Sequence, residues 1–122
     1  MAETLFIVTP SPHERTRITA ALADDALVIE TYESITQFFE HVSDTVSGCV
    51  VAPIDLPAPG LRAMIDEITR RHLALAVVVI GRDSEFAAAV ELVRSGAFDF
   101  LEHPFSDRRL RSVIRHAIGA GA

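Results

Sequence analysis

The sequence predicts a single doubly wound α/β domain, (βα)₅, in which five parallel strands alternate with five helices. Three observations predict this fold class. Short apolar runs alternate along the chain with stretches whose apolar residues recur at helical spacing. The apolar runs are continuous, which is typical of parallel strands covered by helices on both faces of the sheet. The chain has 122 residues, 49% of them hydrophobic and 23% charged, which suits one domain with its own core.

Five short apolar runs are the predicted strands, at residues 5–8, 27–29, 49–52, 75–80 and 98–101. The third run stops at Pro53, because proline cannot donate a hydrogen bond to a sheet ladder. Crossovers between parallel strands are right-handed. In such a sheet the functional crevice lies beyond the carboxyl ends of the strands.

Capping signals place the first two helices. Ser11 with Glu14 forms a capping box with proline at the first helical position, so a helix should begin there and run through Leu22. Ser34 with Gln37 forms a second capping box, and that helix should run through Val42.

The other three helices follow from spacing and from turn residues. After the loop marked by Pro57, apolar residues recur at helical spacing over 61–68. A fourth helix over 86–93 closes at Gly96. Ser106 or Asp107 caps a fifth helix, whose apolar residues are Leu110, Val113, Ile114 and Ile118.

Composition and charge exclude several classes of function. The net charge of −6 disfavours nonspecific binding of nucleic acid by this domain. The apolar runs are too short to span a membrane, and no signal peptide is evident, so we expect a cytoplasmic protein without membrane association. All eleven basic residues are arginine, so chemistry that requires a lysine of this chain is excluded.

No motif indicates a cofactor, a metal or catalysis. The five histidines lack the spacing of metal ligands. The segment 9–12 carries two prolines where a phosphate-binding loop needs backbone N–H groups. Cys49 lies inside an apolar run and is expected to be buried and inert. We therefore expect a protein that is not an enzyme and holds no cofactor.

The segment 95–105, Ser-Gly-Ala-Phe-Asp-Phe-Leu-Glu-His-Pro-Phe, resembles the receiver domain of bacterial response regulators, the CheY-like family. Leu56-Pro57 with Gly60 is similar to the turn that follows the third strand in that family, one residue shorter. The resemblance covers essentially the whole chain. It implies a five-stranded sheet of order 2-1-3-4-5 and a role in two-component signal transduction.

The residues that this resemblance implies for phosphorylation are absent. Family members have two metal-binding acids after the first strand, an aspartate nucleophile ending the third, a hydroxyl ending the fourth and a lysine after the fifth. The matching residues here are Thr9 and Pro10, Pro53, Ile80 and His103, and only the following Pro104 is kept. Proline cannot be phosphorylated, and neutral side chains are poor ligands for Mg²⁺. Asp55 is interpreted as the only acid near this pocket, with Arg82 or His103 as its expected ion-pair partner.

A second group of residues predicts a protein-interaction face. The fourth helix is apolar nearly all round, a pattern typical of helices covered on both sides, and in this fold one side has no covering element. Receiver-like domains often dimerise through the fourth helix, fifth strand and fifth helix, using charges of both signs. Phe100 matches the aromatic switch position of the family, and we expect it to pack in one state. The expected face comprises Phe86, Val90, Glu91, Arg94, Asp99, Phe100, Glu102, Arg108 and Arg111.

These observations predict a phosphorylation-independent pseudo-receiver, a signalling, dimerisation or protein-interaction module of a response regulator that is expected to be a transcription factor. Residues 1–122 are expected to be the N-terminal part of a longer regulator, with an output domain after the Gly-Ala-Gly-Ala ending. Two alternatives remain open. The domain is a second-messenger or small-ligand sensor whose arginines hold phosphates, or it is an active receiver phosphorylated at Asp55.

Overall fold

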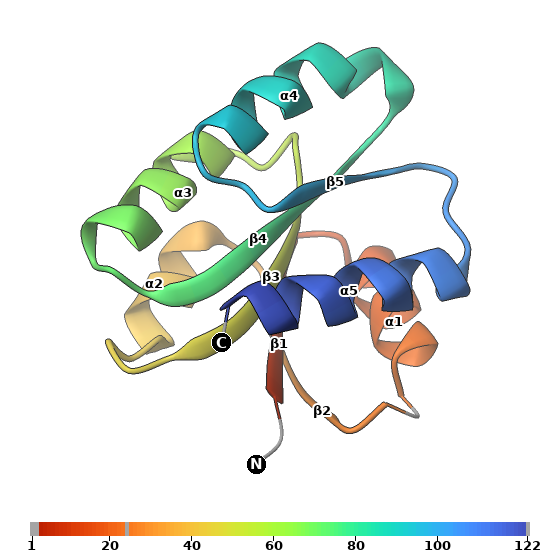
Figure 1. The fold of residues 1–122 in the computed structure, drawn as a ribbon, viewed down its shortest axis with the longest axis horizontal. Helices are drawn as coiled ribbons and strands as arrows, with labels where there is room; N and C mark the ends of the chain where they lie inside the picture. Colours follow the sequence, from red (N-terminus) through yellow and green to blue (C-terminus); the bar gives the residue numbers. More distant parts are fainter. Residues whose placement is uncertain (1–2, 24, 122) are drawn as a thin grey trace.

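The five apolar runs form one parallel sheet of order β2-β1-β3-β4-β5 in the computed structural model, which describes residues 3–23 and 25–121 (Figure 1). Met1, Ala2 and Ala122, parts of the terminal segments named above, lie outside the described residues. The predicted fold class and strand order are confirmed. The strands are β1 (Glu3–Val8), β2 (Leu27–Tyr32), β3 (Ser47–Pro53), β4 (Ala74–Gly81) and β5 (Asp99–Glu102).

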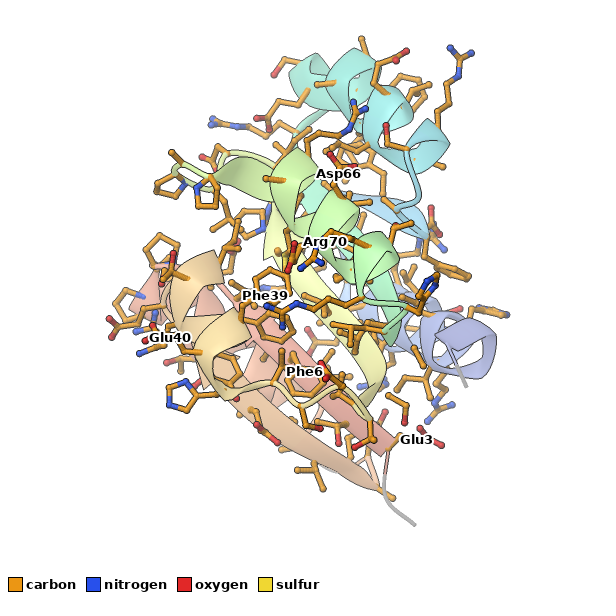
Figure 2. All side chains as sticks on the ribbon, turned by 90° about the vertical axis from the view of Figure 1, so that its left-hand side faces the viewer. Glu3, Phe6, Phe39, Glu40, Asp66 and Arg70 are labelled. Atoms are coloured by element: carbon orange, nitrogen blue, oxygen red, sulfur yellow. The ribbon has the colours of Figure 1, made fainter. Side chains whose placement is uncertain are left out.

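The helices form two layers, one on each face of the sheet. They are α1 (Pro12–Ala21), α2 (Ile35–His41), α3 (Gly60–Arg70), α4 (Phe86–Arg94) and α5 (Asp107–Gly121), with a short 3₁₀ helix, η1 (Asp83–Glu85), before α4. Apolar residues of α1 and α5 pack on one face, and those of α2, α3 and the end of α4 pack on the other. Figure 2 views this second face, where Phe39 of α2 turns toward α3 and Arg71 lies over its ring at 5.1 Å.

The predicted caps are present as hydrogen bonds. Ser11 Oγ accepts from the amide of Glu14 at 3.1 Å, and Ser34 Oγ accepts from the amide of Gln37 at 3.0 Å. Ser106, and not Asp107, caps α5, because its Oγ accepts from the amide of Arg109 at 3.0 Å. These caps satisfy amide groups that have no partner within the first turn of a helix.

Strand β2 departs from the expectation of strands buried on both faces. Its side chains are half-buried or exposed along the whole strand, and Val28 keeps 45% of its surface exposed. The reason is its place at the edge of the sheet beside α2, which is only seven residues long and ends at His41, with the expected Val42 as its cap. A continuous apolar run therefore does not by itself distinguish an edge strand from a central one.

The centre of the sheet is buried as expected. Cys49 in β3 has no exposed surface, and burial raises the pKa of its thiol to about 12. None of the helices in the described ranges combines the length and the apolar composition that a membrane crossing requires.

Candidate functional site

A solvent-open cavity of about 440 Å³ lies beyond the carboxyl ends of β1, β3, β4 and β5. All the predicted pocket residues except Pro104 line it: Thr9, Pro10, Pro53, Asp55, Ile80, Arg82 and His103. Pro104 lines a neighbouring groove between β5 and α5. The structure therefore brings together the positions at which the family places its phosphorylation chemistry.

Thr9 and Pro10, at the end of β1, are not arranged to hold a metal ion. Thr9 is buried, its Oγ1 accepts from the amide of Ser11 at 3.2 Å, and its carbonyl accepts from Arg15 Nη1 at 2.7 Å. Pro10 has no side-chain oxygen. Across residues 3–23 and 25–121, no three His, Cys, Asp or Glu side chains lie close enough together to hold a metal ion. The Mg²⁺ that the family uses does not fit the residues present.

The end of β3 carries no nucleophile. Pro53 pairs in register with Ile80 of β4, and the amide of Ile54 donates to the carbonyl of Ile80 at 2.8 Å. The side chain at the position of the family's aspartate is thus an inert ring at the wall of the cavity. Asp55 lies two residues further on and is exposed.

The expected ion pair of Asp55 is wrong. Among the described residues, the structure has no ion pair between Asp55 and either Arg82 or His103. His103 instead lies near Glu14 of α1, with Nε2 and Oε2 3.7 Å apart. The amide of Arg82 donates to Glu85 Oε1 at 2.8 Å.

Asp55 is also not the only acid near the pocket, because Glu14 and Glu85 line the same cavity. Glu14 is the third residue of α1, and the first turn of this helix lies at the carboxyl edge of the sheet. Glu85 ends η1, which the sequence does not predict. A signal for Glu14 is present in the sequence, because any residue of a helix's first turn after a strand lies near that edge of the sheet.

His103 contacts α1 indirectly, through Phe105. The rings of His103 and Phe105 lie 4.8 Å apart and are tilted by 35°, and the guanidinium of Arg17 lies over the Phe105 ring at 4.3 Å. Arg17 Nη2 also donates to the carbonyl of Phe105 at 2.7 Å. The loop after β5 is therefore fastened to α1 by contacts that need no phosphoryl group.

Gly81, which sequence reasoning missed, lies beside Phe100 at the end of β4. A Cβ added at Gly81 would lie 2.9 Å from Phe100 Cε1 and 3.1 Å from Ile54 Cγ2. The side chain of Ile80 packs into the core with residues of α5, on the opposite face of the strand. Neither residue offers a hydroxyl. Successive side chains of a strand point to opposite faces of the sheet, and this alternation is the sequence signal that Ile80 and Gly81 face opposite sides of β4.

The outer side of α4 is uncovered, and Figure 1 shows α4 as the outermost helix beyond β5. Phe86 keeps 57% of its surface exposed and meets Phe100 edge-on, with ring centroids 6.3 Å apart. Two grooves of about 260 and 470 Å³ flank this pair. Most of the predicted interaction residues line one or other groove: Phe86, Val90, Arg94, Asp99, Phe100 and Glu102.

Arg111 is a correction to the predicted face. Its Nη1 donates to the carbonyl of Ala21 at 3.4 Å, which places the guanidinium on the α1 side of α5. Arg109, which was not among the predicted residues, lines the groove beside Phe86 instead. Helical spacing shows which arginines share a side of α5 but does not show which neighbour that side meets.

Comparison with known proteins settles the family. The family model for the response regulator receiver domain matches residues 5–115. The chain belongs to this family. It is 28% identical to the transcriptional regulatory protein FixJ of Azorhizobium caulinodans, covering 83% of this chain and 48% of FixJ. It is 26% identical to the DNA-binding transcriptional regulator NtrC of Escherichia coli, covering 93% of this chain and 24% of NtrC.

Solved receiver structures share the fold as a whole. The receiver domain of NtrX from Brucella abortus superposes with a TM-score of 0.85 at 27% identity, covering 94% of this receiver and 98% of that chain. A longer NtrX structure from the same organism gives a TM-score of 0.88 at 28% identity, covering 99% of this receiver and 28% of that chain. This receiver thus spans about half the length of FixJ and about a quarter of NtrC.

Proposed function

We propose that this receiver is a pseudo-receiver, a non-enzymatic module of a transcription regulator that signals by protein contact and does not accept a phosphoryl group. The observation that carries the proposal is Pro53 at the end of β3, where the resemblance to the family implies the nucleophilic aspartate. Phosphoryl transfer needs an attacking oxygen, and a proline ring has none.

The surroundings of Pro53 support the same conclusion. The cavity has no lysine, Gly81 beside Phe100 offers no hydroxyl, and the two residues after β1 are Thr9 and Pro10 in place of acids. Transfer of a phosphoryl group depends on cations that neutralise its developing charge. Every part of that machinery is replaced here, so restoring one part does not restore the reaction.

The small-ligand alternative receives no support for phosphorylated second messengers. Asp55, Glu14 and Glu85 line the cavity, against Arg82 and His103. Carboxylates facing a phosphate at close range repel it, and more strongly when the groups are partly desolvated. Of the arginines in the described residues, Arg82 alone lines this cavity.

We infer that signalling proceeds through the α4–β5–α5 face, defined by Phe86, Val90, Glu91, Arg94, Asp99, Phe100, Glu102, Arg108 and Arg109. Phe86 is an exposed aromatic side chain between two grooves, and the surrounding charges have both signs. Aromatic anchors inside a polar rim are typical of protein interfaces. The proposed occupant is a second copy of this domain, and the domain is proposed to be the N-terminal part of a regulator with an output domain.

The decisive experiment is incubation with Mg²⁺ and acetyl phosphate, followed by measurement of the intact mass. A phosphorylatable receiver treated in parallel shows that the reagent is active. We expect no change of mass in this receiver. One added phosphoryl group would overturn the proposal, and the variant Asp55→Asn would then show whether Asp55 accepts it.

A further inference from the structure

The edge of the sheet at β2 lies on the opposite side of the sheet from β5 and the α4–β5–α5 face. Within residues 3–23 and 25–121, β2 pairs only with β1, in parallel and in continuous register over six residues from Leu27 to Tyr32. Figure 1 shows β2 as the last strand at the lower side of the sheet. Val28, Glu30 and Thr31 are exposed.

The direction of the backbone groups follows from one hydrogen bond. The amide of Thr9 donates to the carbonyl of Tyr32 at 3.0 Å, so the backbone groups of Tyr32 face β1. Because these groups alternate in direction along a strand, those of Glu30 and Val28 also face β1, and those of Thr31 and Ile29 face outward. The outer edge of β2 therefore presents amides and carbonyls that have no strand partner in this domain.

This edge lacks the features that usually block pairing. Proteins protect edge strands with lysine, proline or a bulge. The segment 27–32 contains no proline, the register with β1 has no bulge, and the chain contains no lysine. Its one charged residue is Glu30, and two of the other residues, Val28 and Ile29, are β-branched and apolar.

We propose that β2 pairs antiparallel with β2 of a second copy of this chain, about a two-fold axis at Ile29. Ile29 then faces its own symmetry mate as a hydrogen-bonded pair, which uses its outward amide and carbonyl. In this register Val28 lies opposite Glu30, and Leu27 lies opposite Thr31. Sliding one strand by two residues, which moves the two-fold axis from Ile29 to Glu30, would place the two Glu30 side chains opposite each other, which is unfavourable.

The occupant is a second copy because the edge is self-complementary. A two-fold interface uses the same patch on both partners, and the Ile29-centred register sets the two β-branched Ile29 side chains against each other and keeps the two Glu30 side chains apart. β2 and β5 are the two opposite edges of the sheet, so pairing at β2 leaves the α4–β5–α5 face free. The proposal is therefore independent of the proposed function.

Charge variants at exposed positions test the register without touching the core. Val28→Glu places two like charges opposite each other, and we expect it to weaken self-association by at least about tenfold in sedimentation equilibrium. Adding Glu30→Lys to Val28→Glu restores an opposite-charge pair and should restore association. Ala20→Glu, at an exposed alanine of α1 outside both proposed surfaces, is the control and should leave β2 pairing intact. If Val28→Glu associates like the wild type, or if the double variant fails to recover, the proposal is wrong.

Cysteine pairing gives a second, direct readout. In the proposed register, residue 28 of one copy faces residue 30 of the other as a non-hydrogen-bonded pair, close enough for a disulfide. A mixture of Val28→Cys and Glu30→Cys chains should form cross-linked dimers under mild oxidation, and each chain alone should form few. Cys49 has no exposed surface and does not compete. No cross-link in the mixture, or equal cross-linking by each variant alone, would overturn the proposal even if the domain dimerises through α4.

Discussion

The carboxyl-edge cavity and the α4–β5–α5 face lie on neighbouring parts of one molecule, yet they differ in what they retain. The cavity lies at the strand ends, where prolines, an isoleucine, a glycine and a histidine stand at or beside the positions at which the resemblance to the family implies reactive groups. The α4–β5–α5 face has the exposed Phe86 against the half-buried Phe100, two grooves and charges of both signs.

Under the proposed function, this difference makes the chemistry and the contact surface of a receiver separable. The core residues lie within the strands and on the inner sides of the helices, whereas the reactive positions lie at or just beyond the strand ends. Changing the strand ends therefore leaves the packing that supports α4 and β5 unaltered. On this proposal, the receiver lacks phosphorylation chemistry and still presents a surface to a partner.

The largest expected effect is at the α4–β5–α5 face. Phe86→Arg replaces the exposed aromatic anchor by a charge, and we expect self-association through this face to weaken by at least about tenfold. Analytical ultracentrifugation measures the change. Ala20→Arg, an exposed substitution on α1, is the control and should have no effect. Unchanged association of Phe86→Arg would remove this face from the proposed function.

Gly81→Thr tests how closely the end of β4, at the cavity, packs against Phe100 of the α4–β5–α5 face. The new Cβ would lie within 3.1 Å of Phe100, Glu85 and Ile54, so these side chains must shift, at a cost of roughly 1–3 kcal/mol in the free energy of unfolding. Urea denaturation measures the cost. Gly119→Ala on α5 meets no neighbour within 4 Å and should be neutral or stabilising. Equal stability of Gly81→Thr and wild type would show that Phe100 is not held by the close approach of Gly81.

Glu14→Gln tests the contact between α1 and the loop after β5. The two side chains are partly exposed, so the charged pair contributes only about 0–1 kcal/mol. We expect Glu14→Gln to lower the free energy of unfolding by no more than about 1 kcal/mol, measured by urea denaturation. The exposed variant Glu40→Gln, on α2, is the control and should leave the stability unchanged.

Pro53→Asp should have no effect on phosphorylation, the smallest effect of the set. It restores an oxygen at the end of β3, but the metal-binding acids, the hydroxyl and the lysine remain absent. The intact mass after treatment with acetyl phosphate should stay unchanged. Addition of a phosphoryl group to this single variant would mean that the other pocket residues can support the reaction. It would contradict the proposal that the pocket has lost its chemistry while the α4–β5–α5 face keeps its function.

Local signals in the sequence predict most of the fold. The caps at Ser11 and Ser34 and the glycine that ends α4 depend on neighbours within a few residues, and all three are found. The strand ends that line the cavity follow from the same reasoning, because parallel strands bring their carboxyl ends to one edge.

The rest depends on contacts between distant residues. Glu14 and His103 are far apart in the chain, so the sequence does not show that their side chains approach each other. The capping signal accounts for Glu14 at the start of α1 but does not predict this contact. To place Gly81 beside Phe100, one must know which side chains of β4 and β5 point to the same face of the sheet. The direction of Arg111 requires knowing that α1 packs beside α5. None of these is encoded in spacing along one element.

Cys49 provides a built-in reporter of opening motions. It is the only cysteine, it lies in β3 between β1 and β4, and its thiol is both inaccessible and kept protonated by burial. A thiol reagent can modify it only when the middle of the sheet opens, so the labelling rate under native conditions reports the free energy of that opening. The same measurement, made with and without a binding partner, would show how strongly an event on the surface is transmitted to the centre of the molecule.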